Sequence, residues 1–128
     1  GSQYGAFIRD AFHDVFESIH LAKRAGVREE NIILDPGIGF AKDFNKNMEM
    51  MRNLDHLAAL GYPVLLATSR KSMIGEVLGL PPQERVEGTL ATVCYGIQKG
   101  CHMVRVHDVK ETVRTCKMMD ALVGKGTV

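Results

Sequence analysis

Three short apolar runs in this chain each lead into a cluster of polar side chains that could do chemistry. Asp35 follows the run at residues 32–34, SRKS at residues 69–72 follows a second run, and RVHD at residues 105–108 ends a third. Short apolar runs bounded by Gly, Pro or polar residues are typical of buried strands. Because the carboxyl ends of parallel strands meet at one edge of a sheet, we expect the three clusters to form a single site.

Asp35 stands where the first run stops, and Pro36, Gly37 and Gly39 follow it. Proline fixes one backbone angle and glycine accepts turns that other residues resist, so the carboxylate should leave the strand in a fixed direction. A carboxylate that accepts from adjacent N–H groups suits the amino-pyrimidine edge of a pterin or a guanine. Asp before Pro-Gly is also common as the cap of a turn. The residues by themselves leave both interpretations open.

The second cluster places two cations and two hydroxyls at the expected start of a helix, with Ser72 as a candidate N-cap. Cations and helix amides together suit an anion. Arg70 in addition has a planar guanidinium that can cover a flat ring, and Lys71 follows it. The alternative is a solvated basic surface loop.

In the third cluster, Arg105 and His107 are two residues apart, so a strand would point both side chains to the same side. Two potential cations that face inward are costly unless they meet an anion, and phosphate or pyrophosphate is the natural partner. The alternative is an ion pair with a local acid such as Asp108. Asp108 is also expected to cap the last helix.

Apolar periodicity predicts strands that alternate with helices. The expected helices are residues 7–25, 45–60, 72–78, 84–99 and 109–123, and the expected strands are 32–35, 63–68 and 103–107. Such alternation implies right-handed crossovers and a parallel sheet, with its site at the carboxyl ends of the strands. Three strands cannot close a barrel, so the sequence predicts an α/β fold that is either a small open sheet or part of a larger one.

Composition is that of an ordinary globular domain, with 128 residues, 45% hydrophobic and 24% charged. A net charge of +1 argues against bulk binding to nucleic acid or to an anionic membrane. The three cysteines lack Cys-x-x-Cys spacing, which argues against a disulfide framework or a zinc site and favours the cytoplasm. We interpret Gly1-Ser2 as a cloning remnant and residues 3–128 as one domain.

Three motifs, LDPGIGFAK, TSRKSMIG and RVHDVKET, closely resemble in order and spacing the carboxyl-terminal half of bacterial dihydropteroate synthases. That family is a (β/α)₈ TIM barrel of about twice this length. The resemblance implies that this chain is a partial barrel, comprising about the last three βα units and the helix before them. It also implies that the chain is a fragment or half-barrel, because the amino-terminal half of the family is absent.

The resemblance implies a transferase of folate biosynthesis, the target of sulfonamides. Such enzymes join 6-hydroxymethyl-7,8-dihydropterin pyrophosphate to 4-aminobenzoate and release pyrophosphate. Asp35 would hold the pterin ring, and Lys71 would hydrogen-bond the pterin near the forming bond, so these two are the implied catalytic residues. Mg²⁺ would assist on the pyrophosphate, with a ligand from the absent amino-terminal half and none from this chain.

The remaining substrate-binding roles also come from the resemblance. Phe40 would line the aminobenzoate pocket, Ser72 would receive the aminobenzoate carboxylate, and Arg70 would form a wall of the site. Arg105 and His107 would bind the departing pyrophosphate. The implied partners are therefore small molecules, with neither nucleic acid nor membrane.

Other interpretations concern what half a site can do. The chain could be an inactive module that holds pterin or pyrophosphate, or the pterin-binding domain of a folate- or corrinoid-dependent methyltransferase. SRKS followed by RVHD argues against the methyltransferase, which releases no pyrophosphate. The expected strands are apolar on both faces while helices cover one, so we also expect self-association, as a dimer or another homo-oligomer.

Overall fold

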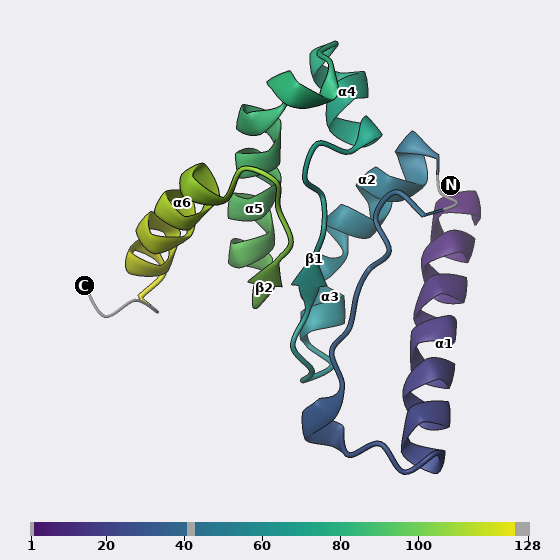
Figure 1. Cartoon of the computed structure of the whole chain (residues 1–128). Coiled ribbons are helices and arrows are strands. Elements are labelled where there is room, and N and C mark those ends of the chain that lie inside the picture. Colours follow the sequence, from purple (N-terminus) through teal and green to yellow (C-terminus); the bar gives the residue numbers. More distant parts are fainter. Residues whose placement is uncertain (1, 41–42, 125–128) are drawn as a thin grey trace.

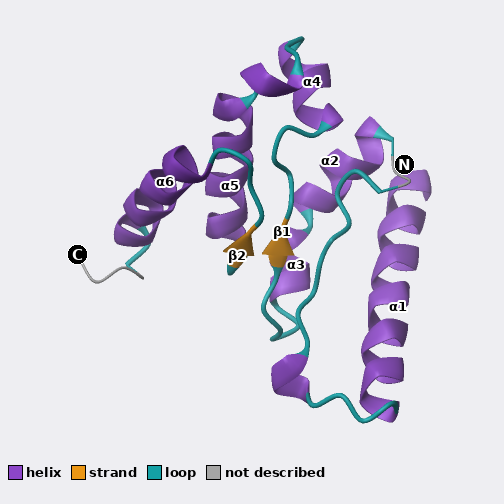
Figure 2. Ribbon diagram, in the orientation of Figure 1, coloured by secondary structure: helices purple, strands orange, loops and turns teal. Residues whose placement is uncertain are grey.

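The computed structural model describes residues 2–40 and 43–124, and helices dominate it. Figures 1 and 2 show an open array, with α1 at one end, α6 at the other, and two short strands between them. The helices are α1 (Ser2–Arg24), α2 (Phe44–Arg52), α3 (Leu54–Ala58), α4 (Ser72–Leu78), α5 (Val86–Lys99) and α6 (Val109–Leu122), with 3-10 turns η1 (Glu29–Asn31) and η2 (Pro82–Glu84). The strands are β1 (Leu65–Leu66) and β2 (Met103–Val104). Of the expected remnant, Gly1 lies outside the described residues and Ser2 is the first residue of α1.

The parallel sheet predicted from the alternating pattern is confirmed. Leu65 pairs with Met103 in parallel register, and an isolated parallel bridge joins Leu34 to Val64. The order across the sheet therefore follows the order along the chain. The strands are much shorter than residues 32–35, 63–68 and 103–107, so the predicted lengths are wrong.

The predicted helices agree closely with the observed ones, with one interruption. Residues 45–60 form two helices, because the chain breaks at Asn53 (φ −110°, ψ 13°). The Asn53 side-chain amide donates to the carbonyl of Glu49 at 2.8 Å. Asparagine side chains compete in this way with backbone hydrogen bonds, and periodicity of apolar residues does not register the competition.

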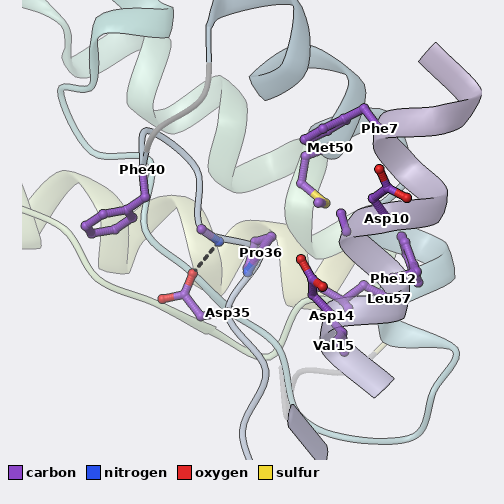
Figure 3. Close-up of a pocket in the computed structure, with 12 residues that line it drawn as sticks. Phe7, Asp10, Phe12, Asp14, Val15, Asp35, Pro36, Phe40, Met50 and Leu57 are labelled. Atoms are coloured by element: carbon purple, nitrogen blue, oxygen red, sulfur yellow. Dashed lines mark hydrogen bonds between the residues drawn. The ribbon is translucent and has the colours of Figure 1, made fainter. Parts of the chain in front are cut away.

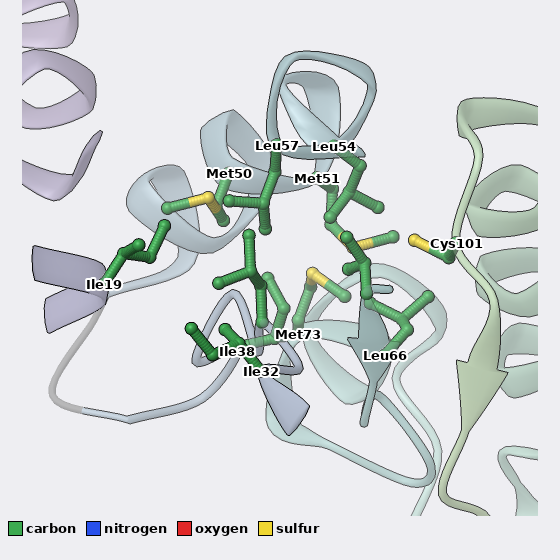
Figure 4. Close-up of a cluster of buried hydrophobic side chains, with 12 residues drawn as sticks. Ile19, Ile32, Ile38, Met50, Met51, Leu54, Leu57, Leu66, Met73 and Cys101 are labelled. Carbon is green, nitrogen blue, oxygen red and sulfur yellow. The ribbon is translucent and has the colours of Figure 1, made fainter. Parts of the chain in front are cut away.

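A hydrophobic core lies between the helices and one face of the three strand segments (Figure 4). Leu54, Leu57, Val64 and Leu66 are at most 1% exposed. Side chains of α1 such as Phe7, Ala11, Phe12 and Val15 pack against this core while remaining partly exposed. Packing against this core therefore fixes the position of the strand segments relative to α2, α3 and α5. The positions of their carboxyl ends are fixed with them.

The opposite face of the strand segments is open. Ile32 and Leu34 are buried whereas Ile33 between them is 53% exposed, and Met103 in β2 is 36% exposed. Alternation of this kind is the period-two pattern of a strand with one covered face. The apolar residues on the open face confirm the prediction that helices cover only one side.

Within the described residues, we find no helix that is both long and apolar enough to cross a membrane.

Candidate functional site

The register of the sheet assigns Asp35, Arg105 and His107 to the same open face. Leu34 pairs with Val64, so Asp35 continues on the side of Leu65, which in turn pairs with Met103. Pairing extends past β2, because the Arg105 N–H donates to the Leu66 carbonyl at 3.0 Å. Arg105 and His107, two and four positions after Met103, then lie on the same face as Met103. Strand geometry thus brings the three predicted residues to one side of the sheet.

Asp35 begins a tight loop whose shape is held by two side chains. One carboxylate oxygen, Oδ1, accepts from the N–H of Gly37 at 2.7 Å, as Figure 3 shows, so the turn-capping interpretation is correct for this oxygen. Gly37 (φ 68°) and Gly39 (φ 89°) adopt conformations that favour glycine. The Gly39 N–H donates to Oδ1 of buried Asn47 in α2 at 3.0 Å. Asp35 itself is exposed, so its other oxygen can accept from a ligand.

Lys71 connects this first loop to the second. Its ammonium donates to the carbonyl of Ile38 at 2.5 Å and lies 4.9 Å from the centroid of the Phe40 ring. Its stem lies over Gly39, where an added Cβ would come within 3.0 Å of Lys71 Cδ. Phe40 is 68% exposed. The structure therefore brings Lys71 and Phe40 together beside the Asp35 loop.

Arg70 connects the second loop to the third. Its guanidinium forms a two-pronged salt bridge with Asp108, with Nη2–Oδ1 at 2.9 Å and Nε–Oδ2 at 3.3 Å. Hydrogen bonding within this pair raises the pKa of Arg70 and lowers the pKa of the Asp108 carboxyl. Asp108 is the N-cap residue of α6 but makes no side-chain capping bond. The predicted cap is therefore wrong, because the carboxylate is engaged by Arg70.

His107 is held by Ser69, whose role the sequence did not reveal. The Ser69 hydroxyl oxygen accepts from the backbone N–H of His107 at 3.0 Å and lies 2.7 Å from Nδ1 of the same ring. When the hydroxyl donates to Nδ1, the ring proton resides on Nε2. In that tautomer Nε2 points away from Ser69 as a hydrogen-bond donor, which suits an anion.

Ser72 and Arg105 are exposed at the edge of the same region. Ser72 is the first residue of α4, but the N-cap residue is Lys71 and no side-chain capping bond forms, so the predicted Ser72 cap is wrong. The alternative of a pair between Arg105 and Asp108 is also wrong, since Asp108 pairs with Arg70. Among the described residues, Arg105 forms no salt bridge, which leaves its charge available to a ligand.

A cavity of about 380 Å³ lies between α1 and the Asp35 loop (Figure 3). Its lining includes Asp35 and Phe40 together with Asp10 and Asp14 of α1. Lys71, Arg105 and His107 are not part of this lining. Of the predicted site residues, Asp35 and Phe40 therefore line this cavity and the others lie outside it. The predicted site residues are connected instead through the chain of contacts between the three loops and through the open face of the sheet.

Comparison with known proteins settles the family. A family model described as pterin binding enzyme matches residues 2–107 of the chain. The chain belongs to the family of pterin-binding enzymes. It is 60% identical over 125 residues to the dihydropteroate synthase of Bacillus subtilis (strain 168), a match that covers 98% of this chain and 44% of that protein. The chain thus spans less than half the length of the curated relatives it matches.

Solved structures of relatives agree with this family and with the expected fold. The Clostridium difficile dihydropteroate synthase, crystallised in the presence of pteroic acid, is 48% identical with a TM-score of 0.87 over 91% of this chain and 44% of that one. The Yersinia pestis dihydropteroate synthase in a sulfonamide drug complex is 35% identical with a TM-score of 0.89 over 92% of this chain and 43% of that one. The chain is accordingly a partial (β/α)₈ barrel, as the resemblance implied.

The sequence did not point to three residues that support the loops of the site: Asn47, Arg85 and Thr89. Asn47 carried a signal, because it lies three and four residues before Met50 and Met51 on the buried stripe, where a polar side chain needs a partner. No sequence pattern marks Thr89 or Arg85. Both contact the backbone of Arg70 from the start of α5. Only the tertiary structure brings them to the loop.

Proposed function

We propose that the protein from which this chain derives is a dihydropteroate synthase of folate biosynthesis, and that the chain supplies the carboxyl-terminal part of its site. The observation that carries the proposal is the linkage of three loops at one sheet edge, by Lys71 to Ile38 and by Ser69 to His107. The names of the relatives, one crystallised with pteroic acid and one with a sulfonamide, support the same reaction. Sulfonamides would then compete with 4-aminobenzoate.

Asp35 and Lys71 are proposed to hold the pterin. The carboxylate oxygen that the turn leaves available accepts from the amino-pyrimidine edge, since Oδ1 already serves Gly37. Lys71 donates to the ring near the reacting methylene carbon. Its placement over Gly39 and against Phe40 restricts the ammonium to the Asp35 side of the site. Preorganised donors of this kind lower the barrier most when they face developing charge.

Arg105 and His107 are proposed to bind the pyrophosphate. In the reaction, the bond between the methylene carbon and the pyrophosphate oxygen breaks, and the pyrophosphate takes the bonding electrons. The arylamine nitrogen then attacks the pterin methylene cation, forms the carbon–nitrogen bond and loses a proton. The departing group carries the growing negative charge, so a guanidinium and an imidazole Nε2–H at the open face would stabilise it.

Phe40, Arg70 and Ser72 are proposed to receive 4-aminobenzoate. The Phe40 side chain is 68% exposed and is aromatic, so it can contribute apolar contact to a flat ligand. The Arg70 guanidinium, held in plane by Asp108, forms a second rigid wall. The Ser72 hydroxyl is not used as a helix cap and can donate to the carboxylate of the substrate. These residues align the nucleophile, and alignment alone contributes substantially to such bimolecular reactions.

Mg²⁺ is proposed to assist the pyrophosphate through a ligand from outside this chain. In the part of the chain that the structure describes, no group of three or more His, Cys, Asp and Glu side chains is arranged to hold a metal. The two side chains assigned to the pyrophosphate, Arg105 and His107, donate hydrogen bonds and suit phosphate oxygens rather than a metal. The chain by itself therefore does not fit the ion, and the roles above do not depend on it.

A second candidate function is a binding module without turnover. It is favoured by the coverage of 44% of the Bacillus subtilis protein, which leaves more than half of the relative without a counterpart. We further propose a cytoplasmic location, since all three cysteines are free thiols. A methyltransferase is the weaker alternative, because Arg105 and His107 would then face no pyrophosphate.

Calorimetry of this chain with pyrophosphate and with a pterin analogue tests the proposal. Arg105→Ala should weaken pyrophosphate binding by about one to two orders of magnitude while leaving the pterin analogue nearly unaffected, because a charge-assisted bond contributes roughly 1.5–3 kcal/mol. Asp35→Ala should show the reverse pattern. Arg114→Ala, on the exposed surface of α6, is the matched control and should change neither affinity.

The assigned roles would be contradicted if each of the two variants lost binding of both ligands. They would also be contradicted if each variant bound both ligands as the parent chain does. Competition by a sulfonamide in the presence of pyrophosphate separates the synthase from a methyltransferase. Release of pyrophosphate with both substrates and Mg²⁺ separates an active enzyme from a binding module.

A further inference from the structure

Arg70 has an unusual backbone conformation. Its φ of 59° makes it the one non-glycine residue with positive φ among residues 2–40 and 43–124. A side chain with a Cβ is disfavoured in this left-handed region, so surrounding contacts must hold it there. A strained residue at a candidate site can set the direction of the residue that follows it, here Lys71.

The contacts come from the start of α5, outside the candidate site. The Arg70 N–H donates to the hydroxyl of fully buried Thr89 at 3.0 Å. The Arg70 carbonyl accepts from Arg85 Nη1 at 2.7 Å, and Arg85 Nε donates to the carbonyl of Leu80 at 2.7 Å. Both backbone groups of the strained residue are therefore held by side chains.

The Arg85 guanidinium is held in place by its packing against α4. A Cβ added to Gly75 in α4 would come within 2.2 Å of Arg85 Nη2, so the glycine leaves the space that the guanidinium occupies. A planar fork with two donors, packed against a backbone without a side chain, has little freedom to turn. The contact that holds the Arg70 carbonyl is thus rigid.

The residue that follows is Lys71, and the peptide between the two residues sets its direction. The Lys71 N–H donates to the Thr68 carbonyl at 3.1 Å, and the side chain then crosses to Ile38 in the first loop. We propose that Thr89 and Arg85 are positioning residues, which hold Arg70 in the left-handed conformation so that Lys71 reaches the pterin side of the site. This inference deepens the proposed function and rests on it for the role of Lys71.

Nuclear magnetic resonance of the full chain provides a direct readout. Lys71 Nζ lies over the Phe40 ring, so the adjacent ε-CH₂ protons should resonate upfield of those of a solvated lysine. Phe40→Leu gives the reference value without the ring. Thr89→Val should move the Lys71 signal most of the way to that reference, and Thr89→Ser, which keeps the hydroxyl, should not. Arg85→Lys should act like Thr89→Val, because an ammonium cannot reproduce the fork.

Thr115→Val is the matched control for the loss of a hydroxyl. The Thr115 hydroxyl donates to Glu111 within α6, away from Arg70, so this variant should leave the Lys71 signal unchanged. A general loosening of the fold would be visible across the whole spectrum, which separates a structural effect from one confined to Lys71.

Glycine at position 70 tests the backbone argument itself. Glycine adopts positive φ without strain, so Thr89→Val should shift Lys71 much less in an Arg70→Gly background than in the parent chain. The positioning role is overturned if Thr89→Val leaves Lys71 in place, or if its effect is as large in the Arg70→Gly background as in the parent chain. Failure of the unsubstituted chain to bind a pterin analogue would instead overturn the proposed function, while the Lys71 signals still decide the positioning role.

Discussion

At the scale of single residues, the candidate site depends on neighbours that remove freedom from charged and polar side chains. Ser69 orients the His107 ring, and Asp108 holds the Arg70 guanidinium in plane. An exposed histidine or arginine without such a partner would sample several rotamers, and ligand binding would have to restrict them. Substitution of either partner should therefore have a measurable effect.

Ser69→Ala should weaken pyrophosphate binding about fivefold, because the loss of one hydrogen bond of about 1 kcal/mol releases the His107 ring. Calorimetry with pyrophosphate measures the change. Ser72→Ala is the control: its hydroxyl is assigned to aminobenzoate, so pyrophosphate binding should be preserved. Equal effects of the two substitutions would argue against a specific role for Ser69.

The Arg70–Asp108 pair should make the stability of the chain sensitive to acid. The pKa of Asp108 is lowered in the folded chain by the hydrogen bond to Arg70. The contribution of the pair is therefore complete above the unfolded pKa, about 4, and disappears as pH falls through the lowered value. Denaturant unfolding at a series of pH values should show a shallower acid dependence for Asp108→Asn. Arg70→Met should flatten the curve in the same way, and an unchanged slope in either variant would be evidence against the pair.

At the scale of elements, α5 is the helix that connects the sheet to the loops. Its first turn contacts Arg70 through Thr89, and its last turns pack on β1 through Gly96. A Cβ added at Gly96 would lie 2.6 Å from Leu66 Cδ2. The close approach of this helix to β1 therefore requires a residue without a side chain.

Gly96→Ala should lower the free energy of unfolding by about 1–3 kcal/mol, because an extra methyl group in a packed core forces neighbours to move. Urea denaturation measures it. Gly5→Ala in α1 is the matched control, since its Cβ would meet only the flexible end of Arg9 at 3.1 Å. That substitution should instead stabilise the helix by up to about 1 kcal/mol. A neutral Gly96→Ala would show that α5 can shift away from β1 at little cost.

At the scale of the whole molecule, the sheet has an uncovered face and two unpaired edges. Ile33 and Met103 are exposed on that face. The match covers 44% of the Bacillus subtilis relative, so more than half of that protein lies outside the matched part. Uncovered strand edges with apolar neighbours favour pairing with another chain. We therefore propose that the isolated chain self-associates, as a dimer or a higher homo-oligomer.

Gel filtration with light scattering over a range of concentrations should detect this association. Ile33→Lys should shift the chain toward monomer, because it places a charge on the open face. Val77→Lys, at a 62% exposed position on α4, changes charge equally and should leave the association intact. A folded monomer at all concentrations, without any substitution, would contradict the proposal.

The sequence alone determined the alternation of helices and strands, the parallel sheet and the three polar clusters at its edge, because each depends on patterns within a few residues. The clusters' partners were decided by the tertiary structure. Asp108 pairs with Arg70 across 38 positions instead of capping its own helix, and Thr89 reaches Arg70 across 19. Contacts at such separations depend on how the helices pack on the sheet, and local spacing does not encode that packing.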